Sequence, residues 1–376
     1  MSELHCDRIF AEIDLEAARH NLKTLTAMVP GEKLVCSVIK ANAYGHGAVQ
    51  MAAAIDDLSD YFAVATVDEG IELREAGFTE KPILVLGSVL PAEYDRAIEY
   101  SLELSIFQAE RAEMLNEAAI EHGDMADIHI AVDTGMSRIG LRPDETGADI
   151  VEKISKLSNI NIVGAFTHFA KADETDKTSA NAQRDRFAAF KELVVQRGIE
   201  IPIWHCANTA GIIEGIGREF DMVRVGISLY GLFPSDEVRR DVDLRPVMSF
   251  RSYITYIKEI EAGTEISYGG IFRAPRRMRI ATVSAGYADG FARSISLNGG
   301  EVILKGKRCR ILGRICMDQF MMDLTDVPDA KEGDIVTLMG RDGDAVVSAE
   351  EAGAKSARIN YEVVCDISPR VPRVYI

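Results

Sequence analysis

An alternation of apolar and helix-like segments runs through the first two thirds of this 376-residue chain, and it limits the possible folds more than any other feature. Eight short apolar segments have the character of strands: 34–40, 61–66, 83–87, 102–107, 127–133, 160–169, 202–208 and 221–226. Segments with helical spacing separate them, and one, RDRFAAFKELVVQRG, stops at Gly198. This alternation predicts a parallel sheet covered on both faces. Eight such units favour a (β/α)8 barrel of the TIM type, with an open doubly wound sheet as the alternative.

The composition changes near Asp241. From residue 242 onward the chain contains strand and turn patterns, with hairpin signals at Gly306, Gly333 and Asp342–Gly343. The last segment, ARINYEVVCDISPRVPRVYI, also has residues typical of strands. We therefore expect an α/β chain with a barrel domain over residues 1–241 and a mostly β domain over residues 242–376.

Charge and cysteine usage exclude several classes of protein. The net charge of -17 argues against nucleic acid or an anionic membrane as partner, and no apolar run is long enough to span a bilayer. The six cysteines show no CxxC spacing, and no export signal precedes them, so we expect reduced thiols and a cytoplasmic protein. The seven histidines are isolated from one another, which predicts no metal site.

One lysine ends an apolar strand. The run LVCSVIK stops at Lys40, and a loop of small residues with Tyr44 follows it. A lysine half out of an apolar core has an amine that is easier to free and that can condense with an aldehyde. The alternative is a lysine that only extends from the strand end to solvent.

Other candidate residues also lie at or just after the C-terminal ends of predicted strands, where the active site of a barrel lies. They are Asp133, Met136, Arg138, His168, His205, Asn208, Thr209, Arg224, Gly226 and Ile227. The cations suit a carbonyl compound with an anionic group, and the backbone N–H groups of Gly226 and Ile227 suit a phosphate. An aldehyde, a phosphate and a lysine partner together describe pyridoxal phosphate.

Nine motifs then resemble those of the alanine racemase family, in the order that the family has them. They are VIKANAYGHG, DTGMSRIG, FTHFAKADE, HCANTAG, VRVGISLYG, ISYGGIF, GYADGFAR, GRICMDQ and INYE, and they cover almost the whole chain. The resemblance implies a racemase that interconverts L-alanine and D-alanine with pyridoxal phosphate and supplies D-alanine for peptidoglycan. It also implies a homodimer whose active site is shared between subunits.

The resemblance implies roles for particular residues. Lys40 would hold the cofactor and be the base on one face of the substrate, and Tyr268 would be the base on the other face. Arg224 would face the pyridine nitrogen, and His168 would pack beside the ring and hydrogen-bond Tyr268. The remaining cofactor-binding residues would be Tyr44, Asn208, Thr209, Gly226, Ile227 and Tyr361. Arg138 would bind the substrate carboxylate, with Met317 and Asp318 approaching from the neighbouring subunit.

Two positions depart from the family pattern. Many members carry a lysine, often carbamylated, where this chain has Ala131, so an anion or a nearby amide must position Arg138 or it is held more loosely. Thr209 stands where serine is common, and the hydroxyl is kept.

Three alternative functions remain open from the residues. One is a racemase for serine, lysine, arginine or another amino acid, although Asp173, Tyr287, Arg293 and Arg314 at the family's substrate entrance favour alanine. Another is a non-catalytic pyridoxal-phosphate-binding protein, against which the second domain and Tyr268 speak. The last is a decarboxylase, against which Arg224 speaks.

Overall fold

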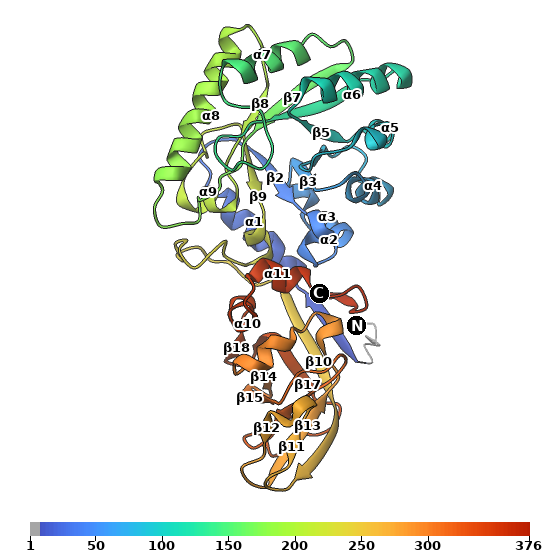
Figure 1. Cartoon of the computed structure of the whole chain (residues 1–376), viewed down its shortest axis with the longest axis vertical. Coiled ribbons are helices and arrows are strands. Elements are labelled where there is room, and N and C mark those ends of the chain that lie inside the picture. Colours follow the sequence, from blue (N-terminus) through green and yellow to red (C-terminus); the bar gives the residue numbers. More distant parts are fainter. Residues whose placement is uncertain (1–7) are drawn as a thin grey trace. The chain divides into compact units, whose positions relative to one another are not determined.

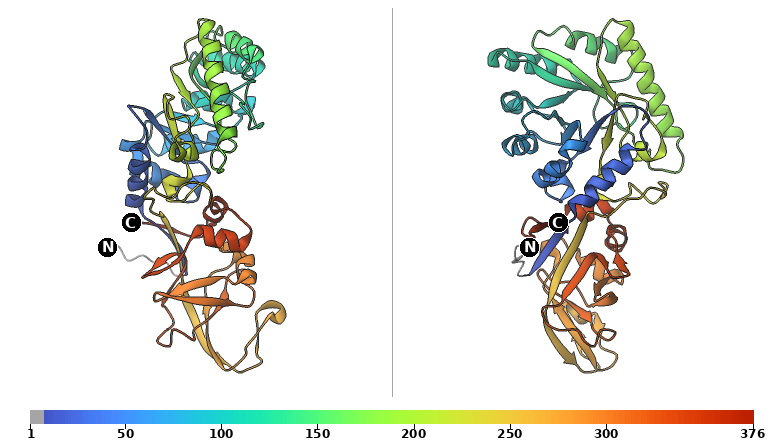
Figure 2. Two further views of the ribbon diagram at one scale, coloured as in Figure 1. Left: turned by 90° about the vertical axis from the view of Figure 1, so that its left-hand side faces the viewer. Right: turned by 180° about the vertical axis from the view of Figure 1, so that it is seen from behind.

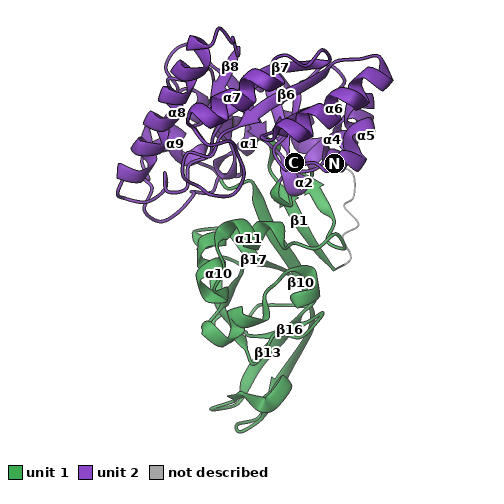
Figure 3. Cartoon of the chain, turned by 45° about the horizontal axis from the view of Figure 1, so that its top comes forward, with its two compact units in different colours: residues 1–16, 44–47, 246–376 green, residues 17–43, 48–245 purple. Residues whose placement is uncertain are grey.

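The computed structural model describes residues 8–376, which form two compact units (Figure 3). The barrel unit comprises residues 17–43 and 48–245, and the sheet unit comprises residues 8–16, 44–47 and 246–376 of the described chain. Short segments near the start of the chain thus belong with its C-terminal part. The predicted boundary at residues 241/242 stays a prediction.

Eight parallel strands form the barrel sheet. They are β2 (Leu34–Val38), β3 (Tyr61–Val64), β4 (Ile83–Val85), β5 (Glu103–Ile106), β6 (Ala126–Ala131), β7 (Ile160–Phe166), β8 (Ile203–His205) and β9 (Met222–Val225). Their order, β8-β7-β6-β5-β4-β3-β2-β9, follows the sequence except that β9 lies next to β2. The N–H groups of Asp221 and Arg224 donate to the carbonyls of Trp204 and Ala207, so the two ends of the sheet also meet. The predicted barrel is confirmed.

The helices of the barrel unit lie outside the sheet (Figure 1 and Figure 2). They include α3 (Ala48–Ile55), α4 (Val67–Glu75), α5 (Tyr94–Glu99), α6 (Ala109–His122), α7 (Glu145–Ile154), α8 (Thr178–Gln196) and α9 (Thr209–Glu214), and α1 (Leu15–Thr26) precedes the first barrel strand. Polar side chains begin several of them, because the first N–H groups of a helix lack partners within it. Thr66 and Asp144 accept hydrogen bonds from Glu69 N–H and Gly147 N–H in this way. No helix in the described part of the chain is long and apolar enough to cross a membrane.

The sheet unit is built on the long strand β10 (Met248–Ile260). It pairs antiparallel with β1 (Ile9–Ile13), β13 (Met278–Val283) and β17 (Ile335–Asp342). The other strands are β11 (Glu265–Ile266), β12 (Phe272–Arg273), β14 (Glu301–Leu304), β15 (Lys307–Leu312), β16 (Phe320–Asp323), β18 (Ala345–Val347) and β19 (Arg373–Tyr375). The predicted mostly β character is therefore confirmed, including turns at Gly306 and Gly343.

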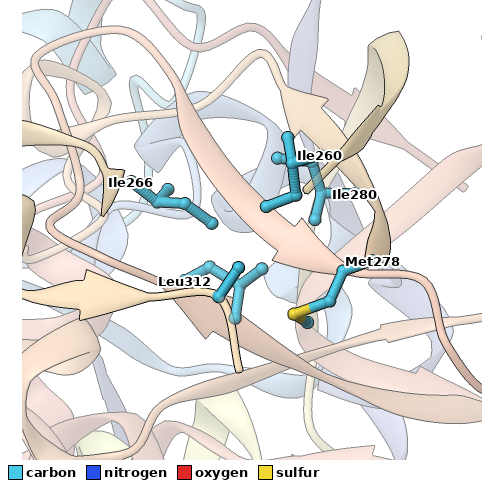
Figure 4. Packing of buried hydrophobic residues seen from close by; sticks show 6 residues of the cluster. Ile260, Ile266, Met278, Ile280 and Leu312 are labelled. Atoms are coloured by element: carbon cyan, nitrogen blue, oxygen red, sulfur yellow. The ribbon is translucent and has the colours of Figure 1, made fainter. Parts of the chain in front are cut away.

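A small apolar core holds one part of this unit together. Ile260, Ile266, Met278, Ile280 and Leu312 are buried against one another from four different strands (Figure 4). Burial of such side chains contributes about 1.5–3 kcal/mol each relative to exposure.

The prediction of strands at the C-terminus is partly wrong. Residues 349–365 form two helices, α10 (Ala349–Ser356) and α11 (Asn360–Cys365), and only β19 is a strand there. Ser348 caps α10, and the Glu362 carboxylate accepts the N–H of Ile359 at the start of α11. These caps, with Val364 buried, outweigh the strand preference of INYEVV. Tyr361 therefore lies on a helix and not on a strand.

Candidate active site

Lys40 lies two residues after the end of β2 and begins α2 (Lys40–Tyr44), a turn with unusual backbone angles. Residues 41–44 all have φ between 51° and 53°, in the left-handed region that costs L-residues roughly 1–2 kcal/mol each. Side chains hold this turn: Asn42 Oδ1 accepts the N–H of Ala48 at 2.8 Å, and Glu69 Oε1 accepts the N–H of Ala41 at 2.7 Å. The backbone of the half-buried Lys40 thus begins a strained turn that two side-chain hydrogen bonds hold in place.

Glu69 joins two strand ends of the barrel. Its second oxygen, Oε2, accepts the N–H of Ala65 at 2.7 Å, just after β3. Sequence reasoning missed Glu69, whose only signal was its position in the first turn of a helix, where carboxylates are favoured anyway.

Arg224 lies inside the barrel on β9, with 3% of its surface exposed. Nη1 lies 2.8 Å from His205 Nδ1, and Nη2 donates to the carbonyl of Thr167 at 2.7 Å. Burial lowers the pKa of Arg224 from its usual range. Because the guanidinium keeps its proton in proteins, the site contains a fixed cation with little access to water.

His168 follows β7 and is neutral at physiological pH. Burial and, to a smaller extent, the positive charges of Arg224, Arg138 and Lys40 together lower its pKa to about 3. The same shift shows that these three cations and His168 share one environment at the end of the barrel.

The loop after β6 is folded around one carboxylate. Asp133 Oδ1 accepts the N–H groups of Gly135, Met136 and Ser137 at 2.9–3.0 Å. This explains Asp133 as a structural residue and leaves the side chain of Arg138 exposed at the end of the loop.

A small cavity of about 20 Å³ lies between Ala131 and Arg138. Among the residues that the structure describes, none forms a hydrogen bond or ion pair with the Arg138 guanidinium. No described side chain of this subunit thus takes the place of the one missing at Ala131, and what positions Arg138 stays a prediction.

Four more predicted residues lie around the start of α9. Asn208 caps the helix, since its Oδ1 accepts the N–H of Gly211 at 2.9 Å. Thr209 Oγ1 accepts the N–H of Gly226 at 2.8 Å, and Ile227 is buried beside Gly226 along the chain. Thr209, Gly226 and Ile227 thus come together as predicted, whereas Asn208 has a structural task that sequence reasoning did not consider.

The remaining predicted residues belong to the sheet unit. Tyr44 and Tyr361 lie with ring centroids 6.1 Å apart, and burial raises the pKa of the Tyr44 hydroxyl. Tyr268 begins the turn η4 (Tyr268–Gly270); Ser267 just before it, and Gly269 and Gly270 within it, have positive φ. The ring of Tyr268 points into solvent, with 63% of the residue exposed.

Met317 and Asp318 lie on an exposed loop that an ion network holds. Arg370 donates to Asp318 Oδ1 at 2.6 Å and to Asp289 Oδ1 at 2.7 Å, and Arg8 also binds the buried Asp289. The side chains of Met317 and Tyr268 are thus presented at the surface of this unit.

Sequence reasoning also missed Glu103 and His129. Both are buried inside the barrel, where they connect to His205 and Arg224. The sequence did contain a signal, because Glu103 and His129 are each a polar residue within a mostly apolar strand, where side chains alternate between the two faces.

Comparison with known proteins gives one consistent match. A family model described as alanine racemase, N-terminal domain, matches residues 13–234, and one described as alanine racemase, C-terminal domain, matches residues 247–375. The alanine racemases of Methanococcus maripaludis and Halothermothrix orenii are 42% and 44% identical to this chain, covering 98% and 97% of it and 98% and 96% of the relatives.

Solved structures agree with these relatives. The alanine racemase of Clostridium difficile 630 superposes with a TM-score of 0.94 at 40% identity, covering 98% of this chain and 96% of that one. The alanine racemase of Bacillus anthracis with bound L-Ala-P gives a TM-score of 0.91 at 36% identity, covering 98% and 95%.

Proposed function

The chain belongs to the alanine racemase family, and from this we propose that it interconverts L-alanine and D-alanine with pyridoxal phosphate as its cofactor. It is an isomerase, and we propose that it works in the cytoplasm and supplies D-alanine for peptidoglycan. The observation that carries the proposal is the cluster of Lys40, a neutral His168 and the buried Arg224 at one end of the barrel.

The barrel unit offers the groups that pyridoxal phosphate needs. Lys40 supplies an amine for the aldehyde, on a backbone that Glu69 fixes. The Thr209 hydroxyl accepts the Gly226 N–H at 2.8 Å and keeps its own hydrogen, which it can donate to the phosphate. Ile227 and Asn208 of the same unit join the proposed binding set, and Tyr44 and Tyr361 are proposed as cofactor contacts from the family resemblance alone. The donor set fits the cofactor.

When bound, the cofactor draws electrons from the substrate and so makes the hydrogen on Cα acidic. Arg224 limits this pull. A guanidinium that keeps its proton can donate a hydrogen bond to the pyridine nitrogen but cannot protonate it. We propose that this restraint favours return of the proton over side reactions such as transamination.

Racemisation must remove a proton from one face of Cα and return it to the other, so two bases are needed. We propose the Lys40 amine on one face and the Tyr268 hydroxyl on the other. The neutral His168 suits a hydrogen bond to Tyr268, because an imidazole without charge can still accept or donate through one nitrogen.

We further propose that Tyr268, Met317 and Asp318 act in the site of a second subunit. Tyr268 and Met317 are 63% and 53% exposed, so both side chains are accessible to a second subunit. A homodimer in which each subunit completes the other's site accounts for this exposure. Arg138 would then bind the substrate carboxylate.

The test is racemisation of a panel of amino acids. The purified chain with pyridoxal phosphate is incubated separately with L-alanine, L-serine, L-lysine and L-arginine, and the products are separated by chiral chromatography. We expect alanine to become racemic well before the others. Lys40→Ala should show no turnover, whereas Lys23→Ala, at an exposed lysine of α1, should behave as wild type.

Two results would contradict the proposal. Faster racemisation of another amino acid would keep the mechanism and reassign the substrate. Bound cofactor without racemisation of any amino acid would instead support a non-catalytic pyridoxal-phosphate-binding protein.

A further inference from the structure

Four polar side chains form a continuous chain across the interior of the barrel. Glu103, His129, His205 and Arg224 come from β5, β6, β8 and β9 and are at most 7% exposed. Polar groups are buried in this way only when they have partners, because each otherwise loses its hydrogen bonds to water.

Each of these side chains lies within hydrogen-bonding distance of the next. Glu103 Oε2 lies 2.8 Å from His129 Nε2, His129 Nδ1 lies 2.9 Å from His205 Nε2, and His205 Nδ1 lies 2.8 Å from Arg224 Nη1. The hydroxyl of Tyr61 also hydrogen-bonds Glu103. Both ring nitrogens of both histidines are therefore engaged.

A glycine makes the middle contact possible. His129 on β6 reaches His205 on β8 across the intervening strand β7, where it pairs in register with Gly164. A Cβ atom on Gly164 would lie 2.2 Å from His129 Nδ1. Any side chain at this position would thus displace the imidazole from its place in the chain.

The donors and acceptors can be matched in only one way with every contact a hydrogen bond. The guanidinium can only donate, so His205 Nδ1 must accept and His205 Nε2 must carry the hydrogen. That hydrogen is donated to His129 Nδ1, which leaves the hydrogen of His129 on Nε2, facing the Glu103 carboxylate. Both imidazoles are then neutral, and the charges lie at the two ends of the chain.

We propose that Glu103 is a positioning residue for Arg224, acting through His129 and His205 as a hydrogen-bonded chain in which both histidines carry their hydrogen on Nε2. The carboxylate is the counter-charge of a guanidinium that has no acidic partner of its own among the described residues. The stacking of Phe166 on His205, with ring centroids 5.3 Å apart, keeps the ring in the plane that the chain requires. The consequence for the cofactor, that Arg224 is held toward its pyridine nitrogen, rests on the proposed function.

The first test needs no cofactor chemistry. In protein labelled with ¹⁵N-histidine, NMR shifts distinguish the two neutral tautomers from imidazolium, and His129→Gln and His205→Gln assign the signals. We expect both residues as Nε2–H tautomers from pH 6 to pH 8. Either histidine as imidazolium, or with its hydrogen on Nδ1, would overturn the proposal.

Variants test whether a change at the Glu103 end of the hydrogen-bonded chain reaches His205. Glu103→Gln keeps an acceptor oxygen and should keep both tautomers, whereas Glu103→Leu and Gly164→Ala should change the His205 signals. Asp127→Asn is the control for a lost nearby charge, because the Asp127 carboxylate on β6 accepts a hydrogen bond from Asn161 and lies near His129 without being hydrogen-bonded to it. If Glu103→Leu leaves the His205 signals as in wild type, the proposal is wrong; if that variant does not fold, Gly164→Ala decides in the same way.

The cofactor readout is separate. We expect the dissociation constant of pyridoxal phosphate to rise at least fivefold in Gly164→Ala and to change less than twofold in Asp127→Asn, with a shifted absorption maximum of the bound cofactor in the former only. Equal behaviour of the two variants would overturn the positioning role. A wild-type protein that binds no pyridoxal phosphate would contradict the proposed function, while the histidine tautomers would still be measured independently.

Discussion

The Nη2 atom of Arg224 lies 3.4 Å from Nδ1 of His168, so a buried cation faces an imidazole that must stay neutral. The charge on Arg224 disfavours a proton on His168, and burial disfavours it more strongly. Residues at this end of the barrel thus have different roles: arginines provide fixed positive charge, while His168 provides a neutral ring beside the proposed cofactor.

This arrangement predicts a dependence of stability on pH. An unfolded chain protonates His168 near its usual pKa of 6.5, whereas the folded chain does so only near pH 3. Between these values the unfolded state binds more protons, so stability rises with pH and falls as the solution is acidified. This histidine should remove up to about 1.4 kcal/mol of unfolding free energy per pH unit below pH 6.

Urea unfolding at pH 8, 7, 6 and 5 measures this slope. Between pH 6 and pH 5, the unfolding free energy of His168→Gln should fall with pH less steeply than that of wild type, by that amount. His122→Gln, which removes a histidine of α6 that pairs with Asp95 outside the site, is the comparison variant. Equal slopes for His168→Gln and wild type would show that His168 does not resist protonation in the fold.

Glu69 should be essential for the turn that carries Lys40. Glu69→Ala removes two acceptors from the backbone N–H groups of Ala41 and Ala65, in a turn already in left-handed conformation. We expect a loss of about 1–3 kcal/mol in unfolding free energy, because each N–H loses a bond to a charged group. Urea unfolding measures the loss, and cofactor titration should show weaker binding.

The matched control is Glu72→Ala, which truncates an exposed carboxylate of the same helix. It should change stability by less than about 0.5 kcal/mol. A Glu69 variant as stable as the Glu72 variant would mean that the turn at residues 41–44 does not depend on the Glu69 hydrogen bonds.

Asn208 should act on stability through the start of α9. Asn208→Ala removes the acceptor for Gly211 N–H and should cost about 0.5–2 kcal/mol. Asn208→Asp keeps an acceptor and should retain most of the stability in the same urea measurement. A loss of cofactor affinity in Asn208→Asp with stability intact would instead favour the direct binding role expected from the sequence.

The eight barrel strands could be predicted because each is a short apolar run with clear ends, and a parallel sheet buries both faces of every strand. The residues at the strand ends could be found for the same reason: Lys40, His168 and Arg224 interrupt apolar patterns. The left-handed turn at 41–44 could not be found, because Ala, Asn and Tyr do not demand positive φ as glycine often does.

The helices α10 and α11 were not predicted. Hydrogen bonds from Ser348 and Glu362 stabilise the starts of these helices, and they outweigh the preference of the local residues for a strand. The chain from Glu103 to Arg224 could not be predicted either, since it depends on strands that are distant in sequence and on the space above Gly164. Single polar residues in apolar strands indicate burial with a partner, but only the fold says which partner.

The two-base mechanism is the central claim, and solvent isotope incorporation tests it most directly. Wild type and Tyr268→Phe are incubated in D₂O with either L-alanine or D-alanine, and deuterium at Cα is measured in the substrate and product pools by mass spectrometry. We expect Tyr268→Phe to lose exchange from one enantiomer far more than from the other, because Lys40 still serves its own face. Equal losses from both enantiomers would contradict a separate base on each face.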